Sequence, residues 1–488
     1  MRQNLNLSLL ANKIFPFLAL AFCTSSFAQI QWTGGGEVSA KSFGNHYPRM
    51  AVDGMGNPLV IWGRSGDESV FLSRYNGVSF TTPIKLNGLL TVASANWMGA
   101  DIASHGDTIY VVMKQTPESE PASLIHLVKS FNGGRSFTPP VRVDSSTGSI
   151  SRFPAVACDP EGHPIVAFMK FDASFKESRW VVARSNDFGE SFSMDQKASG
   201  WGNSEAVCDC CPGTIISQGN VCAMLYRNNR ANIRDCWAGI STDRGYQFTD
   251  GFALENNNWN LMSCPSSSPD GIILDDTLYS VFMNGVSGKQ RTYLSRSSLP
   301  NRMLSSITTL TETIPGLTLQ DDPRIASDGT AAAIVWRQIA GASAQLLLLF
   351  TRNVANGFPA SYDTVDLADI TSEDVAMSNG NIYVVWADDR SGTVKYRFGQ
   401  YTPSTTGNAD PSAADFDIFP NPATDILNIR SNGSKPFSAS IHHSTGRRIY
   451  AEYGIENCSL NIGDWADGIY FLQLRTHLGL CTKMFIKQ

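Results

Sequence analysis

The chain has few charged residues and no excess of basic ones. Only 17% of its 488 residues are Asp, Glu, Lys or Arg, the formal net charge is −6 and the pI is near 5.7. The chain therefore lacks the excess of positive charge that is typical of nucleic-acid-binding proteins. Apolar runs are also scarce: beyond the first 28 residues, none is long enough to cross a bilayer. Aromatic residues make up 10% of the chain, which favours a folded protein over a disordered one.

The first 28 residues have the order of a secretory signal peptide. Arg2 and Lys13 precede an apolar run over 14–22, and small residues close the segment at Ala28. The run is too short for a membrane-spanning helix, so we expect cleavage and export. Cys23 raises the alternative of a lipoprotein.

An eight-residue phrase, Ser-x-Asp-x-Gly-x-x-Phe, recurs along the chain. It is complete at 185–192 and 241–248, has Asn in the Asp place at 130–137, and has Tyr75 there at 73–80. The serines stand 55 to 57 residues apart, and a fixed period of this size indicates a repeat architecture. In each copy Asp or Asn is suited to cap a tight turn, and Gly to a positive φ.

This phrase resembles the Asp-box (BNR) motif of the sialidase-like β-propellers, where it lies on hairpin turns away from the active face. The residues that carry the resemblance are Ser130, Asn132, Gly134, Phe137, Ser185, Asp187, Gly189, Phe192, Ser241, Asp243, Gly245 and Phe248. The resemblance implies an all-β propeller over 29–401, made of four-stranded antiparallel blades.

The number of repeats predicts the number of blades. Apolar second strands end at an aromatic or Met residue in seven places: Trp62, Met113, Met169, Tyr226, Met283, Trp336 and Trp386. We therefore expect seven blades, with six as the alternative. The last unit lacks a fourth strand, and we expect residues 37–42 to supply it and close the ring.

The C-terminal part differs in character. Residues 402–414 are rich in Pro, Ser, Thr and Gly and are expected to form a linker. Alternating apolar residues between Gly, Asn and Asp turns over 415–488 predict a small antiparallel β-sandwich. The order of its motifs closely resembles the C-terminal sorting domain of the type IX secretion system of Bacteroidota. That resemblance implies export across the outer membrane, with release or attachment at the surface.

Position within the repeat predicts which side chains share a rim of the ring. First strands begin, and second strands end, on the rim opposite the recurring phrase. The ligand-binding candidates on that rim are Arg49, Asp101, Arg227, Arg324, Arg337 and Asp374. With the ring closed, four of them should follow one another in the order Arg324, Asp374, Arg49, Asp101.

This alternation of charge has two interpretations. One is an arc of ion pairs that satisfy each other, because charges near a channel need partners. The other is a cleft that presents arginines to a carboxylate or hydroxyl-rich ligand. The sialidases resembled here use three arginines, a Tyr–Glu pair and an Asp, with the first arginine in an Arg-Ile-Pro phrase. This chain reads Tyr47-Pro48-Arg49-Met50 at that place, so the motif assigns no catalytic residues.

Cysteines gather in the middle of the chain, with Cys208-Asp209-Cys210-Cys211 expected on the first strand of the fourth unit. The disulfide candidates are Cys158, Cys208, Cys210, Cys211, Cys222, Cys236 and Cys264. Export permits disulfides, but sequence cannot give their connectivity, and a vicinal bond between Cys210 and Cys211 is one option. We expect Cys158 and Cys264 to approach the channel from the neighbouring units. The alternative is a soft-metal site; no other cofactor is expected.

Three hypotheses of function follow. The first is a propeller, secreted or attached to the outer-membrane surface, that binds or processes an extracellular glycan or glycoprotein. The second is a non-catalytic adhesion or scaffold propeller, and the third is metal handling at Cys208–Cys211. The expected partners are the glycan and the type IX secretion machinery, without nucleic acid and without a transmembrane segment.

Overall fold

The computed structural model describes residues 29–145, 148–202, 206–312, 314–402, 416–431, 437–443, 448–455, 457–476 and 479–488. The predicted signal peptide, 1–28, lies outside these residues, as does nearly all of the predicted linker. No helix within the described ranges is long and apolar enough to span a membrane.

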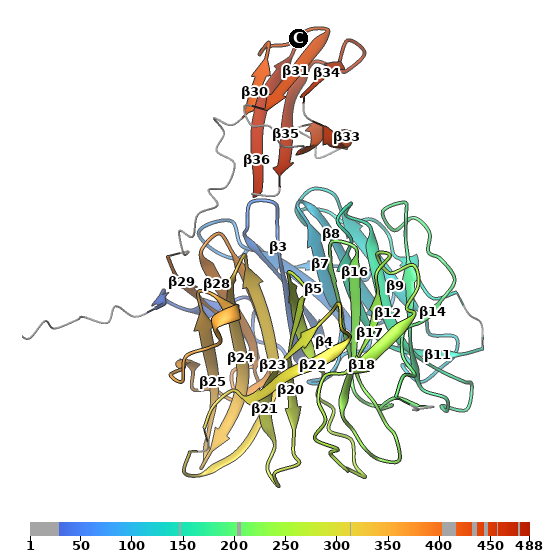
Figure 1. Ribbon diagram of the computed structural model, residues 1–488, viewed down its shortest axis with the longest axis vertical. Helices are drawn as coiled ribbons and strands as arrows, with labels where there is room; N and C mark the ends of the chain where they lie inside the picture. Colours follow the sequence, from blue (N-terminus) through green and yellow to red (C-terminus); the bar gives the residue numbers. More distant parts are fainter. Residues whose placement is uncertain are drawn as a thin grey trace, which may run out of the picture.

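Residues 31–400 form seven antiparallel sheets consistent with propeller blades, numbered here in chain order (Figure 1). Sheet 1 comprises β3 (Asn45–Val52), β4 (Pro58–Arg64), β5 (Ser69–Arg74) and β6 (Ile84–Lys85), and sheet 2 comprises β7 (Asp101–His105), β8 (Thr108–Lys114), β9 (Ile125–Ser130) and β10 (Val141–Arg142). Sheet 3 comprises β11 (Ile150–Cys158), β12 (Pro164–Phe171), β13 (Arg179–Arg184) and β14 (Gln196–Lys197), and sheet 4 comprises β15 (Thr214–Gln218), β16 (Val221–Arg227), β17 (Cys236–Ser241) and β18 (Asp250–Ala253).

The remaining sheets follow the same plan. Sheet 5 comprises β19 (Asp270–Leu274), β20 (Thr277–Asn284), β21 (Arg291–Ser298) and β22 (Met303–Thr309). Sheet 6 comprises β23 (Leu317–Asp328), β24 (Ala331–Ala340), β25 (Ser343–Thr351) and β26 (Asp363–Asp366), with the short 3₁₀ helix η1 (Val354–Asn356) before its last strand. Sheet 7 comprises β27 (Ile370–Ser378), β28 (Asn381–Asp388) and β29 (Thr393–Gln400), to which β1 (Gln31–Trp32) and β2 (Gly36–Glu37) add.

The second strand of each sheet lies between layers of side chains from its neighbours. Every residue of β12 is buried, and so is every residue of β16 after the first. Such strands are covered on both faces, which is why they form continuous apolar runs instead of alternating. Each sheet therefore stabilises the next by burial of apolar surface, so the stability of each sheet depends on its neighbours.

The first and last sheets meet. The innermost strand of each sheet contacts that of the next in order around the ring, and β27 of sheet 7 contacts β3 of sheet 1. Trp62 and Val60 from sheet 1 share one hydrophobic cluster with Tyr383 and Val385 from sheet 7. Figure 1 shows this junction, where β3 lies near β28.

The N-terminal segment supplies the outer strand of sheet 7, but from an earlier position than we predicted. Pairing with β29 begins at Gln31, opposite Gln400, and resumes at Gly36 and Glu37. Of the predicted range, 37–42, only Glu37 lies in a strand, although Ser42 still donates a backbone hydrogen bond to Gly392. Gly35 allows the close approach, because a Cβ there would lie 2.7 Å from the carbonyl oxygen of Tyr396.

The recurring phrase forms tight turns held by its own side chains. In the copy at 185–192, Asp187 accepts hydrogen bonds from Ser185 Oγ and from the backbone N–H groups of Glu190 and Ser191. Ser185 Oγ also accepts a bond from the N–H of Gly189, whose φ is 80°. The predicted cap and the predicted positive φ are thus both present.

The C-terminal residues form a separate pair of sheets around their own core. One sheet comprises β30 (Phe416–Phe419), β31 (Ile426–Ser431) and β34 (Asn457–Asn461). The other comprises β32 (Phe437–His443), β33 (Arg448–Ile455), β35 (Gly468–Thr476) and β36 (Gly479–Lys487). Apolar side chains from both sheets meet in one cluster that includes Leu427, Ile441 and Phe485, as expected for a small sandwich.

We expect the turn at 185–192 to depend on the acceptor at 187. Asp187→Ala should lower the free energy of unfolding by about 1–2 kcal/mol, because backbone donors of the turn lose their partner. Asp187→Asn is the matched control and should stay close to the wild type, because Asn132 accepts the equivalent bonds from Arg135 and Ser136. Urea denaturation of all three proteins measures the difference; equal stability of the Ala and Asn variants would contradict the capping role.

Candidate functional site

Four innermost strands carry a β-bulge at the same rim. The pairing register shifts in β3 between His46 and Arg49, and in β11 between Arg152 and Ala155. It shifts in β23 between Asp321 and Arg324, and in β27 between Ile370 and Ser372. A bulge turns side chains out of the regular alternation, and bulges are common beside active sites.

Three of these bulges share an unusual local structure. Tyr47, Phe153 and Asp322 each precede a proline and have φ values of 51°, 52° and 47°. Positive φ is rare for such residues, and sterics normally push the residue before proline to extended backbone. Each such residue costs about 1–3 kcal/mol, and strain of this kind concentrates at functional sites.

Two adjoining pockets lie at these bulges, with Tyr47, Arg49 and Arg324 lining both. The first, with a cavity volume of about 10 Å³, is also lined by Met98, Gly99, Asp101, Phe153, Pro154, Ala155, Pro212, Gly213 and Thr214. The second, with a cavity volume of about 20 Å³, is also lined by Asn96, Trp97, Ser266, Ser268, Asp322, Pro323, Ser372 and Glu373. We call the two together the mouth pockets; they draw residues from sheets 1, 2, 3, 4, 6 and 7 and from the loops between sheets, including the loop before sheet 5.

Buried aspartates join neighbouring sheets around the mouth pockets. Asp101 Oδ2 accepts a hydrogen bond from the N–H of Val156, at 2.9 Å, and Asp374 Oδ2 accepts one from Met50, at 2.8 Å. Asp270, which we did not predict, accepts one from Ile325 at 2.9 Å. Each bond links an aspartate of one sheet to the inner strand of the next, and burial raises the pKa of Asp101 and Asp270.

Arg324 lies between two of these aspartates. Its Nε is 3.2 Å from Asp374 Oδ1 and 3.5 Å from Asp270 Oδ2. Burial disfavours its charge, but the two carboxylates outweigh this and raise its pKa. The predicted neighbours Arg324 and Asp374 are therefore paired, as the ion-pair interpretation expects.

The other two candidate arginines near the mouth pockets are also engaged. Arg337 forms a two-pronged pair with Asp321, in which the Nε–Oδ1 distance is 2.8 Å, and this pairing raises the pKa of Arg337. Arg49 donates from Nη1 to the carbonyl oxygens of Pro48 and Glu373, at 2.7 and 3.3 Å. Its guanidinium lies 3.5 Å from the centre of the Tyr47 ring, as in a cation–π contact.

Glu373 is the least satisfied group of the site. It is 1% exposed and lines the second mouth pocket, and neither carboxyl oxygen has a hydrogen-bond partner among the described residues. Burial first, and then the charges of Asp322 and Asp321, raise its pKa well above the usual range. Burial and Asp321 also raise the pKa of Asp322. A carboxyl without a partner in such a place is tolerated best when it holds its proton.

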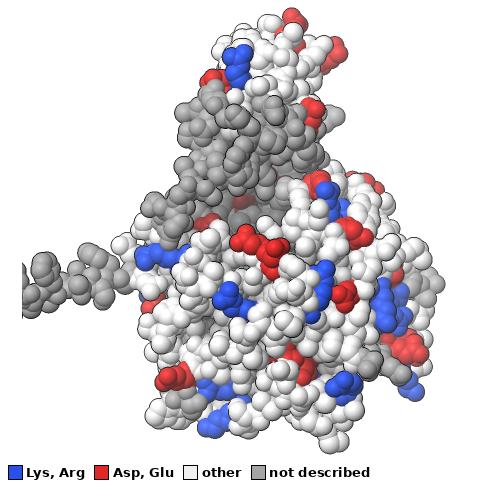
Figure 2. Space-filling view, in the orientation of Figure 1, with Lys and Arg blue, Asp and Glu red and all other residues white. Residues whose placement is uncertain are grey.

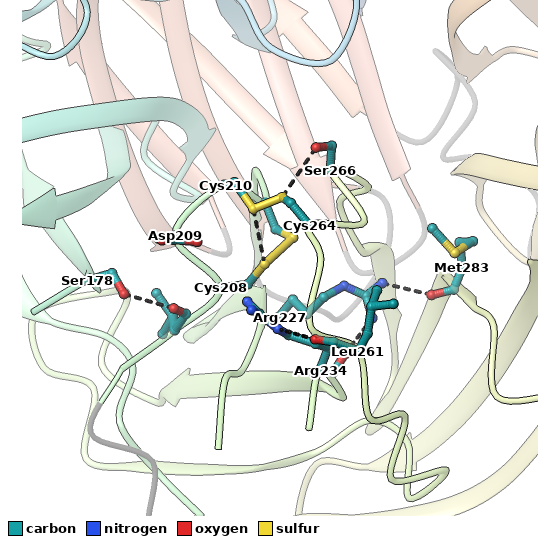
Figure 3. The surroundings of a disulfide bond; sticks show 12 residues. Ser178, Cys208, Asp209, Cys210, Arg227, Arg234, Leu261, Cys264, Ser266 and Met283 are labelled. Atoms are coloured by element: carbon teal, nitrogen blue, oxygen red, sulfur yellow. Dashed lines mark hydrogen bonds between the residues drawn. A yellow bond between two sulfur atoms is a disulfide. The ribbon is translucent and has the colours of Figure 1, made fainter. Parts of the chain in front are cut away.

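Arg227 is placed away from the mouth pockets. It is fully buried beside Glu255 and donates to the carbonyl oxygens of Arg234 and Met283, at 2.6 and 2.7 Å (Figure 3). Its guanidinium thus holds sheet 4 to sheet 5 and has no exposed face for a ligand.

Figure 2 shows acidic and basic groups interspersed on one face of the molecule, without a field of one sign.

The recurring phrase lies at the opposite ends of the strands. Arg184, just before the copy at 185–192, pairs with Asp159 in the turn between β11 and β12. Arg244, within the copy at 241–248, pairs with Glu161 in that same turn. The bulges lie at the other end of β11, so the two rims carry different chemistry, as predicted.

The four cysteines next to the mouth pockets form two disulfides, Cys208–Cys211 and Cys210–Cys264. The vicinal bond considered above is not formed. The segment 208–211 lies in a loop before β15 and not on the strand, and Cys264 likewise precedes β19. Figure 3 shows the two bonds side by side and Cys264 beside Ser266, its Sγ 3.3 Å from the serine Oγ. Cys210–Cys264 therefore ties the loop before β15, whose Pro212 lines the first pocket, to the loop before β19, whose Ser266 lines the second.

Three other cysteines were wrongly included among the disulfide candidates. Cys158, Cys222 and Cys236 are free. The three belong to or pack against different hydrophobic clusters, and Cys158 lies at the end of β11 away from the channel. Burial raises the pKa of each thiol, which disfavours the reactive thiolate; Cys222 and Cys236 are buried in the core, and Cys158 is half-buried.

The second mouth pocket was not predicted from the sequence. Two of the residues that line it were missed: Asp322, within a bulge, and Trp97, in the loop before β7. The available signal was the recurrence of Pro near the start of a first strand, at Tyr47-Pro48, Phe153-Pro154 and Asp322-Pro323. Glu373 has no such signal, because its burial depends on sheet 6 as well as sheet 7.

Residues 417–488 match the secretion system C-terminal sorting domain. The C-terminal sandwich is a type IX sorting domain, and it implies export to the cell surface or beyond. A search of curated proteins found no match to the chain.

Solved structures of β-propellers are similar to this chain. A protein of unknown function from Dyadobacter fermentans is 11% identical, with 64% of this chain and 97% of that one covered and a TM-score of 0.44. An α-L-arabinofuranosidase of Fusarium graminearum is 13% identical, with 66% and 99% covered and a TM-score of 0.44. A sialidase of Trypanosoma rangeli is 10% identical, with 93% and 89% covered and a TM-score of 0.45. Similarity at this level does not tell what this chain binds.

The two disulfides predict a difference in thiol count. After denaturation, reduction should release four more thiols than the unreduced protein shows, because Cys208, Cys210, Cys211 and Cys264 are paired. Titration with a thiol reagent measures this, and elemental analysis of the same sample should find no stoichiometric zinc or copper. If reduction releases no additional thiols and the sample contains stoichiometric zinc or copper, the soft-metal site is established instead.

Glu373 predicts how stability depends on pH. A carboxyl whose pKa is raised in the folded state costs stability as pH rises from its unfolded value, about 4.3, towards the folded value. Glu373→Gln removes this cost, so the variant should be more stable than the wild type at pH 8 and the gain should vanish at pH 4. Denaturation at both pH values tests this; Asp276→Asn, an exposed turn residue of the opposite rim, should show no such pH-dependent gain.

Proposed function

We propose that the protein is a seven-bladed propeller, exported by the type IX system, that binds and hydrolyses an extracellular glycan at the mouth pockets. Residues 1–28 serve as the signal peptide, 29–401 as the propeller, 402–414 as the linker and 415–488 as the sorting domain. The cyclic contacts between the seven sheets support the blade number. After export, the protein itself is either released or held at the outer-membrane surface.

The composition of the mouth pockets supports a carbohydrate ligand. Tyr47 and Trp97 offer aromatic surface for the apolar face of a sugar ring. Asn96, Ser266 and Ser268 offer amide and hydroxyl groups that match sugar hydroxyls. A concave site with aromatic surface and a few polar groups is typical of small-ligand binding.

The buried, unpartnered carboxyl of Glu373 carries the hydrolytic part of the proposal. A glycosidase needs one carboxyl that is protonated at working pH to donate to the leaving oxygen, and a second one nearby. Glu373 has the raised pKa and the position in the pocket wall that an acid requires, and Asp322 lines the same pocket. The negative charges of Glu373 and Asp322 would repel each other, so the state in which the two carboxyls share one proton is favoured over the state in which both are ionised. We assign Glu373 as the acid and Asp322 as the second carboxyl.

The scaffold alternative retains one observation in its favour. Asp101, Asp374, Arg324 and Arg337 all have structural partners, so most of the predicted charged arc is explained without a ligand. A scaffold does not explain why Glu373 is left without a hydrogen bond in a pocket wall.

Hydrolysis of a panel of aryl glycosides and oligosaccharides by the full chain tests the proposal. We expect Glu373→Gln to lower kcat by about 10²-fold or more, because a general acid contributes 10²–10⁴-fold, while its stability at pH 8 rises. Asp276→Asn is the control and should keep full activity. If glycans bind but no substrate is cleaved, the protein is a lectin; if none binds, the scaffold alternative is favoured.

A further inference from the structure

The charges around the mouth pockets point to the class of glycan, an inference that rests on the proposed function. Three guanidinium groups of the predicted set, of Arg49, Arg324 and Arg337, line or adjoin the pockets. A fourth, of Arg152, lies over the rings of Trp97 and Phe153 and is paired with Glu118. Six carboxyl groups besides Glu118 line or adjoin the pockets: Asp101, Asp270, Asp321, Asp322, Glu373 and Asp374. Carboxyls therefore outnumber guanidiniums.

The three arginines are also committed. Arg324 lies within 3.5 Å of two aspartates, and Arg337 uses both edges of its fork on Asp321. Binding of a ligand carboxylate by either would require breaking a buried pair and leaving an aspartate without its counter-charge, which is costly. Neither can act as the free fork that clamps a carboxylate.

Arg49 forms no ion pair among the described residues, but its charge is opposed from several sides. Its Nη1 is held by two backbone carbonyl oxygens, and its face is covered by the Tyr47 ring. Its charge interacts electrostatically with three carboxyl groups from sheets 2, 6 and 7, those of Asp101, Asp322 and Glu373. A ligand carboxylate that approached Arg49 would meet these carboxyls as well.

We propose that the mouth pockets select a glycan without acidic groups and reject those with sialic or uronic acid. Of the interpretations that the sequence left open, this proposal argues against arginines that present themselves to a ligand carboxylate. The carboxyls are well suited to accept hydrogen bonds from neutral hydroxyl groups, and Asp101, Asp322 and Glu373 form no ion pair among the described residues.

Matched glycan pairs test the selection on the full chain. Each pair consists of a neutral oligosaccharide and its acidic counterpart, such as lactose with 3′-sialyllactose and oligogalactose with oligogalacturonate. We expect the neutral member to bind at least about tenfold more tightly, with the difference shrinking in high salt as the charges are screened. An acidic member that binds equally well or better would overturn the selection but leave the glycan-binding function intact. Failure of every glycan to bind would overturn both.

Two variants check that the mouth pockets are responsible. Glu373→Gln combined with Asp322→Asn removes the one negative charge that these two carboxyls carry when they hold one proton, and should bring the affinities for the acidic and neutral glycans of each matched pair closer together. Asp276→Asn removes one charge from the opposite rim and should leave the discrimination unchanged. If the double variant does not fold, Asp322→Asn alone, which leaves Glu373 protonated, should shift the ratio in the same direction. An unchanged ratio in a folded Asp322→Asn variant would contradict the proposal.

Discussion

Hydrogen bonds that aspartates accept from the backbone of the neighbouring sheet are the interaction on which the ring and its mouth depend. Asp101, Asp270 and Asp374 stand near the start of inner strands, and each accepts a backbone N–H of the next sheet. A hydrogen bond to a charged acceptor contributes about 1.5–3 kcal/mol, and these link segments up to 324 residues apart. Apolar packing brings the sheets together, but it is non-directional. The aspartates fix the sheets in register at the rim where the pockets lie.

This role divides the charged side chains of the rim into two groups. Asp374 accepts a backbone N–H and the Nε–H of Arg324, and Asp270 accepts a backbone N–H and forms an ion pair with the same nitrogen, so sheets 5, 6, 7 and 1 are joined through one arginine. Such groups are structural, and they account for much of the alternation of charge seen in the sequence. Glu373 and Asp322 take no part in these links. The proposed site is therefore defined by Glu373 and Asp322, the carboxyl groups that do not link one sheet to the next.

The sequence predicts the repeat better than it predicts the pockets. The spacing of the Ser-x-Asp-x-Gly-x-x-Phe phrase, its capping Asp187 and the positive φ of Gly189 are local properties, so they could be inferred from neighbouring residues alone. The opposite placement of the two rims follows from strand direction. The partner of Asp374, by contrast, is Met50, and the pairing of Cys210 with Cys264 crosses two sheets. Contacts of this kind depend on the closed ring, which no local pattern encodes. The bulges had a local signal, a large residue before proline, but its meaning depends on the register of the adjoining strand.

The backbone at the mouth gives a physical reason to prefer a ligand over a scaffold. Tyr47, Phe153 and Asp322 adopt a left-handed conformation directly before proline, in three different sheets and at one rim. Glycine at these positions would remove most of the steric cost, although at Phe153 it would also remove a side chain buried in the core. Glycine would also remove the ring of Tyr47 over Arg49 and the carboxyl of Asp322 from the pocket wall. The strain is retained together with side chains that line the pockets, and packing of seven sheets around the channel is what allows the fold to tolerate it.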